Sequence, residues 1–135
     1  MTATLDVREG FVVATTPAIT SHARVVLRTD PTEGVDGCDP ALAVFHDVHA
    51  ACSRFDPESE LHHCNARAGD WHFVSGTCLS ALREAWWAYR RSGGGFDPRL
   101  PAASASGGVR LPWRPRFADA APSVHLGGDP VDLDG

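Results

Sequence analysis

Short apolar runs separated by turn-forming residues make up the N-terminal part of the chain. Residues 11–14 are apolar and end at a Thr-Thr-Pro break, and residues 22–28 are rich in valine and end near an Asp-Pro pair. β-Branched and aromatic residues fit a pleated, half-buried surface, so both segments are predicted to be strands. Residues 1–9 are polar and are expected to be frayed, and residues 31–37 have the composition of a turn.

A longer periodic pattern follows and predicts a helix. Its apolar residues recur at steps of three and four and form one stripe: Leu42, Phe45, Val48, Cys52 and Phe55. Such spacing places side chains on one face of a helix. Asp39 is a good N-cap, and Pro40 then occupies the first helical position, where its missing N–H group costs nothing. The helix is expected to end near Arg54, because the next Asp-Pro pair disfavours helical backbone.

A short strand and a second helix are predicted in the middle of the chain. Residues 71–74 favour the strand, and Ser75 is the predicted N-cap of the helix. The buried face of this helix is marked by Cys78 or Leu79, Leu82, Ala85 or Trp86, and Tyr89. Arg90 and Arg91 complement the helix dipole in the last turn. Gly93 stands where a left-handed C-terminal residue is favoured.

These elements predict an α+β fold, with two helices packed on a small antiparallel sheet. Beyond the second helix Gly, Pro, Ala and Ser dominate, so residues 99–135 are expected to form an irregular tail with a weak strand at 124–126. Trp86 and Trp87 are adjacent and cannot both face one core, so one of them is expected to be exposed. An exposed tryptophan and an open strand edge at 25–27 favour self-association.

Composition and charge narrow the possible classes of partner. The net charge of −5 and the lack of a basic surface argue against general binding to nucleic acid or to an anionic membrane. All 12 basic residues are arginine, so a lysine nucleophile, a Schiff base and a P-loop lysine are excluded. No apolar run approaches the roughly 20 residues that span a bilayer, and no signal-peptide pattern opens the sequence. A cytoplasmic location is therefore expected.

The cysteines and histidines raise the alternative of a zinc site. In a cytoplasmic chain without a C-x-x-C pair, the cysteines are expected to be buried free thiols. The candidate zinc ligands are His49, Cys52, His62, His63, Cys64 and Cys78. They provide one compact group, at 62–64, whereas structural zinc sites usually have paired ligands on two arms. No serine–histidine–aspartate signature is visible, and no catalytic residue is predicted.

Three segments resemble the ApbE family, the FAD:protein FMN transferases. Residues 53–61, with Asn65 four positions further on, are similar to the family's S-x-F/Y-x-x-x-S-E-L-x-x-x-N stretch. Residues 71–75 resemble its short strand and helix cap, and residues 92–98 are close to its T-D-G-A-F-D-P-T motif. The order and spacing of these segments also agree with the family. Residues 131–135 resemble the start of its D-L-G-G-I-x-K-G segment.

The resemblance implies the N-terminal portion of an ApbE-like fold over residues 1–98 and a tail over residues 99–135 that ends at the start of the D-L-G-G segment. It also implies transfer of FMN from FAD to a threonine hydroxyl of an acceptor protein, with AMP released and Mg²⁺ required. The residues implied to bind FAD are Phe55, Asn65, Gly95, Phe96, Asp97 and Asp132. The family's metal ligands and its lysine belong to the second half of its fold, so this chain is expected to be truncated and inactive alone.

Several implied site residues also have a structural explanation. The glycines at 93–95 can cap the preceding helix, Phe55 is the last residue of the apolar stripe, and Asn65 is a residue type common in turns. Arg99 and Asp134 depart from the family's pattern, which has Thr and Gly at these positions.

The sequence leaves three alternative functions open. A non-catalytic flavin or nucleotide-binding protein would bind FAD without transferring FMN. A small zinc-binding module would hold a stoichiometric metal ion through the cysteines and histidines. An interaction protein would use an exposed tryptophan and the Gly/Pro-rich end as its docking surface.

Overall fold

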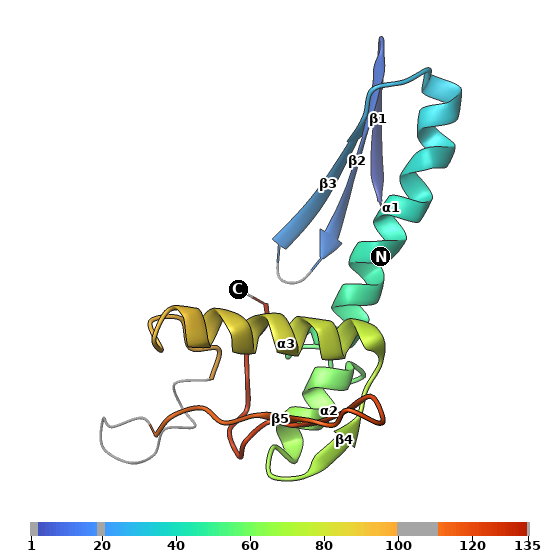
Figure 1. Ribbon diagram of the computed structural model, residues 1–135. Coiled ribbons are helices and arrows are strands. Elements are labelled where there is room, and N and C mark those ends of the chain that lie inside the picture. Colours follow the sequence, from blue (N-terminus) through green and yellow to red (C-terminus); the bar gives the residue numbers. More distant parts are fainter. Residues whose placement is uncertain (1–2, 19–20, 100–110, 135) are drawn as a thin grey trace. The chain divides into compact units, whose positions relative to one another are not determined.

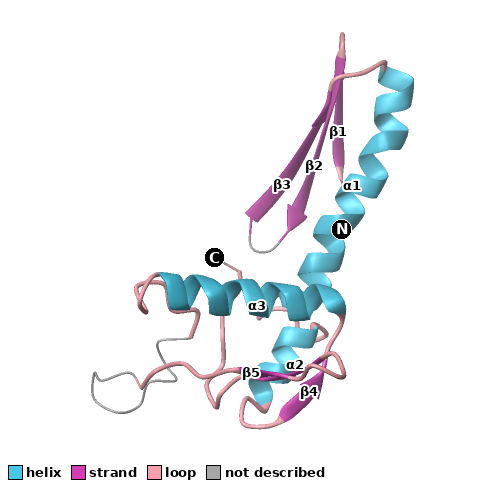
Figure 2. Cartoon of the chain, viewed as in Figure 1, coloured by secondary structure: helices cyan, strands magenta, loops and turns pink. Residues whose placement is uncertain are grey.

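The computed structural model divides the chain into two compact units, Met1–His49 and Ala50–Gly135. The residues that it describes are 3–18, 21–99 and 111–134. Helices and two antiparallel sheets form the described part of the chain (Figure 1 and Figure 2). The architecture is therefore α+β, as the sequence predicts.

The first unit holds a three-stranded antiparallel sheet in the order β1-β2-β3 (Figure 1). Its strands are β1 (Thr4–Arg8), β2 (Phe11–Ala18) and β3 (Ser21–Leu27). The predictions for β2 and β3 are confirmed, and β2 is longer than its apolar run indicates. The expectation of a frayed N-terminus is wrong for β1. Gly10 has a positive φ of 81° in the turn that follows β1, and Arg8 pairs with Phe11 across that turn.

Helix α1 extends over Pro31–Cys52 and begins earlier than the sequence analysis predicts. An Asp-Pro pair starts the helix as expected, but the pair lies at 30–31 and not at 39–40. The carboxylate of Asp30 accepts a hydrogen bond from the N–H group of Thr32 at 2.9 Å, and proline takes the first helical position. The prediction of a turn in this stretch is therefore wrong.

Two glycines allow the first part of α1 to approach the sheet closely. A Cβ atom on Gly34 would lie 2.7 Å from Cγ2 of Val12, and one on Gly37 would lie 3.0 Å from Cδ1 of Leu27. Burial against the sheet outweighs the poor helix propensity of glycine here. The core of this unit consists of Val12, Ala14, Cys38 and Leu42.

The second unit contains the end of α1 and a second three-stranded sheet, with strand order β4-β6-β5. Its further elements are α2 (Glu60–Ala66), β4 (Trp71–Phe73), α3 (Gly76–Arg91), β5 (Arg116–Phe117) and β6 (Ser123–His125). The predicted strands in β4 and β6 and the predicted helix α3 are confirmed. Ser75 caps α3 by accepting a hydrogen bond from the N–H group of Cys78 at 3.3 Å.

Helix α2 is an element that the sequence analysis does not predict. Ser59 is its N-cap and accepts a hydrogen bond from the N–H group of His62 at 3.1 Å. The Ser59 hydroxyl also donates to the backbone carbonyl of Ser53. Glu60 joins α2 to the start of α3, because its carboxylate accepts from the N–H and hydroxyl groups of Ser75, each at 2.5 Å. The two hydrogen bonds of Glu60 fix α2 to the start of α3.

Aromatic residues of α3 pack against the C-terminal segment. Trp86 and Tyr89 stack with ring centroids 5.7 Å apart, and Trp113 meets both rings edge-on. The indole N–H group of Trp113 donates to the carbonyl of Leu126 at 2.8 Å. Trp87 is 54% exposed, which confirms that one of the adjacent tryptophans faces solvent. The described part of the expected tail has little regular structure, yet it is packed against α3.

Candidate functional site

The loop after α3 begins with glycines in a left-handed backbone conformation. Gly93 and Gly94 have φ values of 61° and 84°, which confirms the predicted left-handed C-terminal residue. The Ser92 hydroxyl accepts a hydrogen bond from the N–H group of Phe96 at 2.8 Å. A Cβ atom on Gly95 would lie 3.2 Å from the carbonyl oxygen of Ser92, so a larger residue there would crowd the loop. Phe96 is 45% exposed.

A buried arginine joins this loop to residues 129–134, which we call the C-terminal strap. The guanidinium of Arg99 donates to both carboxylate oxygens of Asp97, at 3.0 and 2.7 Å, and to Asp129 at 3.3 Å. The side chain of Arg99 is only 6% exposed. Its hydrogen bond to Asp97 raises the pKa of the guanidinium. Bidentate pairing of this kind fixes the orientation of the Asp97 carboxylate.

Asn65 on α2 also holds the C-terminal strap. Its amide nitrogen donates to the carbonyl of Val131, and its amide oxygen accepts from the N–H group of Val131, both at 2.8 Å. The Asn65 side chain thus supplies one donor and one acceptor, as a peptide group does. Both backbone polar groups of the fully buried Val131 are therefore paired. The N–H group of Asp132 donates to the carbonyl of Pro98 at 2.7 Å. The strap therefore contacts both α2 and the loop after α3.

Arg54 links the C-terminal strap to the loop after α1. Its Nε atom lies 3.0 Å from Oδ2 of Asp132. Its guanidinium carbon lies 3.9 Å from the centre of the Phe55 ring, which is still 56% exposed. The carboxylate of Asp134 accepts hydrogen bonds from the Ser53 hydroxyl and from the Arg54 N–H group, both at 3.1 Å.

The structure brings together the segments that carry the predicted FAD-binding residues. These residues are Phe55, Asn65, Gly95, Phe96, Asp97 and Asp132, all in the second unit. The asparagine and the two aspartates belong to the hydrogen-bond network around the strap. Phe55 adjoins this network through Arg54, and the glycine and Phe96 lie on the loop that carries Asp97.

Sequence reasoning missed most of the residues that hold this arrangement. Ser53 and Arg54 bind Asp134 from about 80 positions away along the chain, and no local pattern marks such a pair. Arg99 was visible only as a departure from the family's motif. A cation after Phe-Asp-Pro, in a region otherwise rich in small residues, is a signal that an acidic partner such as Asp129 lies nearby.

Three of the four cysteines, Cys52, Cys64 and Cys78, lie in the same unit as the C-terminal strap. All four are buried and free, as predicted. Burial, with a smaller effect from the charge of Glu60, raises the pKa of the Cys64 thiol to about 11. A hydrogen bond with Cys52, together with burial, raises the pKa of Cys78. The same hydrogen bond lowers the pKa of Cys52. Among the residues that the structure describes, no group of three or more His, Cys, Asp or Glu is arranged to hold a metal ion.

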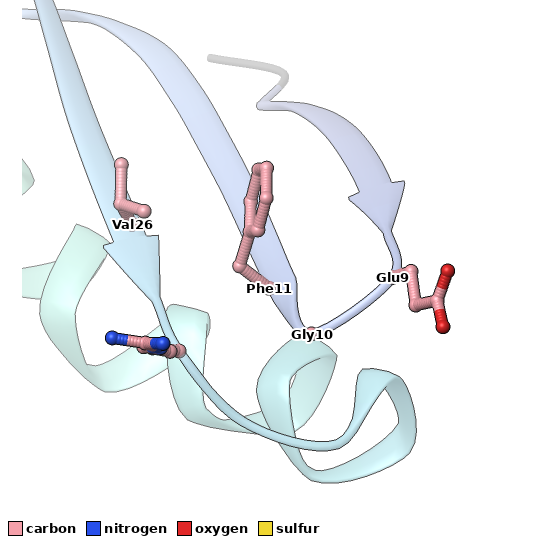
Figure 3. A pocket seen from close by; sticks show the side chains of 5 residues that line it. Glu9, Gly10, Phe11 and Val26 are labelled. Atoms are coloured by element: carbon pink, nitrogen blue, oxygen red, sulfur yellow. The ribbon is translucent and has the colours of Figure 1, made fainter.

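Two surface pockets are lined by other residues. One, of about 470 Å³, is in the first unit and is lined by Glu9, Gly10, Phe11, Val26 and Arg28 (Figure 3). In Figure 3, Phe11 stands at the start of β2 and Val26 on the neighbouring strand β3. The other, of about 210 Å³, is in the second unit and is lined by Trp71, His72, Phe73, Ala118 and Ser123. Neither pocket is lined by a predicted site residue.

Comparison with known proteins agrees with this order of elements. No curated protein matches the sequence. Among solved structures, the crystal structure of the ApbE protein from Thermotoga maritima matches with a TM-score of 0.73 and 17% identity, over 92% of this chain and 47% of that one. At this identity the likeness establishes the fold, and the chain spans about half the length of that protein. The model of the ApbE family matches residues 15–123, and the chain belongs to the ApbE family.

Proposed function

We propose that this chain binds FAD and serves in the transfer of FMN from FAD to a threonine hydroxyl of an acceptor protein. Family membership supports a flavin-transferase function in general terms. The observation that carries the finer proposal is the C-terminal strap. Its hydrogen bonds and ion pairs gather the loop after α1, helix α2 and the loop after α3 in one place. The resemblance assigns FAD contacts to each of these segments.

The residues at this place suit a flavin nucleotide. Phe55 and Phe96 are both about half exposed and offer aromatic surface for stacking on a flavin or adenine ring. The glycine-rich loop allows a ligand to approach the backbone. Arg99 holds the Asp97 carboxylate in a fixed orientation, and Asp132 lies 3.0 Å from Nε of Arg54. A carboxylate oxygen has more than one lone pair, so each aspartate can still accept from a ribose hydroxyl.

The proposed reaction is a phosphoryl transfer. The threonine oxygen forms a bond to the FMN phosphorus, the bond to the AMP phosphate breaks, AMP leaves and the hydroxyl proton is released. Such reactions depend on positioned cations that stabilise the transferred group. The resemblance implies Mg²⁺ for this role, and the described residues contain no group that fits the ion. The residues of this chain therefore bind and orient FAD, and no chemical step is assigned to them.

Because the chain spans about half of its solved relative, we propose that these 135 residues do not transfer FMN by themselves. The proposed transfer also needs a protein acceptor and the remaining half of the family's fold. Self-association and a cytoplasmic location are also proposed. No helix in the described part of the chain is long and apolar enough to cross a membrane.

The test is an FAD titration followed by a transfer assay. Flavin fluorescence measures binding to the chain, and in-gel fluorescence after incubation with FAD, Mg²⁺ and an acceptor protein measures covalent transfer. Phe55→Ala is expected to weaken FAD binding about tenfold, within the range of one lost stacking contact. Phe73→Ala is the matched control, because Phe73 is 83% exposed and belongs to neither the strap nor its contacts. Equal effects of both substitutions, or no binding by the folded wild type, would contradict the proposal.

A non-catalytic flavin-binding protein is the second candidate. The observation that favours it is that Asp97 and Asp132 are each paired with an arginine, which suits them to accept hydrogen bonds from a ligand rather than to hold a metal ion. Binding of FAD without transfer, when the remaining half of the family's fold is supplied as a separate polypeptide, would favour this candidate over the transferase. Covalent flavin under these conditions would exclude it.

A further inference from the structure

Asp134 fills a small group of hydrogen-bond donors at the end of α1. Its carboxylate accepts from the hydroxyl of Ser53 and from the backbone N–H group of Arg54, both at 3.1 Å. The N–H group of Asp134 in turn donates to Oδ1 of Asp132 at 2.9 Å, which turns the chain toward these donors. Ser53 is only 1% exposed. The donors therefore belong to a formed site rather than to a passing surface contact.

The donors have the character of an anion site. A hydroxyl and a backbone N–H group that converge on one carboxylate are groups that proteins also use to bind phosphate oxygens. The guanidinium of Arg54 lies over the ring of Phe55 and beside Asp132. Each phosphate group of FAD carries a single negative charge, as a carboxylate does, and can accept hydrogen bonds from the same two donors.

We propose that Ser53 and Arg54 form a phosphate-binding site and that the carboxylate of Asp134 occupies it as a built-in competitor. The ligand is a phosphate group of a flavin nucleotide, so the inference rests on the proposed function. Rotation of the Asp134 side chain to another staggered conformation vacates the donors. The observed affinity for FAD is then the intrinsic affinity reduced by the fraction of molecules in which Asp134 is displaced.

The first test compares FAD and riboflavin binding by wild type, Asp134→Ala and Asp134→Asn. Removal of the competitor in Asp134→Ala is expected to tighten FAD binding about tenfold, equivalent to about 1.4 kcal/mol. Riboflavin lacks phosphate, so its affinity is expected to stay the same. Asp134→Asn keeps the size of the side chain but not its charge, and an intermediate affinity is expected. This variant also serves as the test if the alanine variant does not fold.

Asp119→Ala is the matched control for a change in net charge. Asp119 is exposed in the loop between β5 and β6, so this substitution removes one negative charge outside the contacts described for Ser53 and Arg54. Its FAD affinity is expected to equal that of wild type. An Asp134→Ala variant that is folded by circular dichroism and binds FAD no more tightly than the control overturns the inference and leaves the proposed function standing.

A second measurement does not depend on FAD. Inorganic pyrophosphate is added to isotope-labelled protein, and the amide signal of Arg54 is followed by NMR. A shift in Asp134→Ala at pyrophosphate concentrations that leave wild type unchanged supports the site even if no variant binds FAD, in which case only the proposed function fails. An Arg54 signal that does not move in either protein overturns the inference.

Discussion

Replacement of Asn65 by alanine is expected to release the C-terminal strap from α2. The side chain makes two hydrogen bonds of 2.8 Å to the backbone of Val131, which is fully buried. Its removal leaves an N–H group and a carbonyl without their partner. At about 1–3 kcal/mol for each unpaired buried group, and with some relief from water, the free energy of unfolding is expected to fall by about 2–4 kcal/mol.

Asn65→Asp gives a second, sharper version of the same test. The aspartate keeps the acceptor for the Val131 N–H group, but it replaces the amide donor with an oxygen that faces the Val131 carbonyl. Loss of stability at neutral pH is therefore expected to equal or exceed that of the alanine variant, and it is expected to lessen at acidic pH, where the carboxyl is protonated and can donate. His63→Ala, an exposed position on the same helix, is the control and is expected to change stability by less than about 0.5 kcal/mol.

Urea denaturation followed by circular dichroism measures these changes, and hydrogen exchange at the Val131 amide locates them. The alanine variant is expected to lose protection at Val131 before the rest of the second unit unfolds. An Asn65→Ala variant as stable as the His63→Ala control, with unchanged exchange at Val131, would show that Asn65 does not hold the strap and would refute this reasoning.

Three further predictions concern pH, packing and association. Folding raises the pKa of Cys64 to about 11, so the unfolded chain loses this thiol proton at a lower pH than the folded chain does. The free energy of unfolding is therefore expected to fall as the pH rises from about 9 to 11. Denaturation curves of Cys64→Ala are expected to show a smaller fall over the same pH range. Gly34→Ala places a Cβ atom 2.7 Å from Val12 and is expected to lower the free energy of unfolding by about 1–3 kcal/mol. Gly37→Ala is expected to lower it less, because its Cβ atom meets the flexible end of the Leu27 side chain. Equal melting temperatures of the two variants would contradict this packing. Light scattering is expected to show oligomers, since Val26 is 57% exposed on an edge strand, and a sharp monomer peak with a melting temperature above about 60 °C would contradict this.

The start of α1 shows why local patterns predicted the fold class better than its boundaries. The chain has an Asp-Pro pair at 30–31 and another at 39–40, and each is a good helix start. Only the second pair is predicted to start the helix, because residues 31–37, which include two glycines, have the composition of a turn. In the structure these glycines favour the first pair, since Gly34 and Gly37 let the helix lie against Val12 and Leu27. The choice between the two helix starts depends on packing against the sheet, and the residues around each pair do not reveal that packing.

The candidate site shows the same limit at longer range. The family-like motifs identified Asn65, Asp97 and Asp132, and the structure joins all three through the C-terminal strap. The residues that hold them could not be read from the motifs, because each contact depends on how distant segments meet. Arg54 and Asp134, for example, lie 80 positions apart, and the backbone N–H group of Arg54 donates to the Asp134 carboxylate.

NMR amide shifts on addition of FAD to the isotope-labelled chain show whether the segments gathered by the C-terminal strap form the FAD site. If they do, the shifts are expected to concentrate at Phe55, Asn65, Gly95 and Asp132 and to be small at the pocket beside Phe11. Saturable shifts at that pocket in place of the strap, or no shifts at millimolar FAD in a folded protein, would show that the site lies elsewhere or that the chain does not bind FAD.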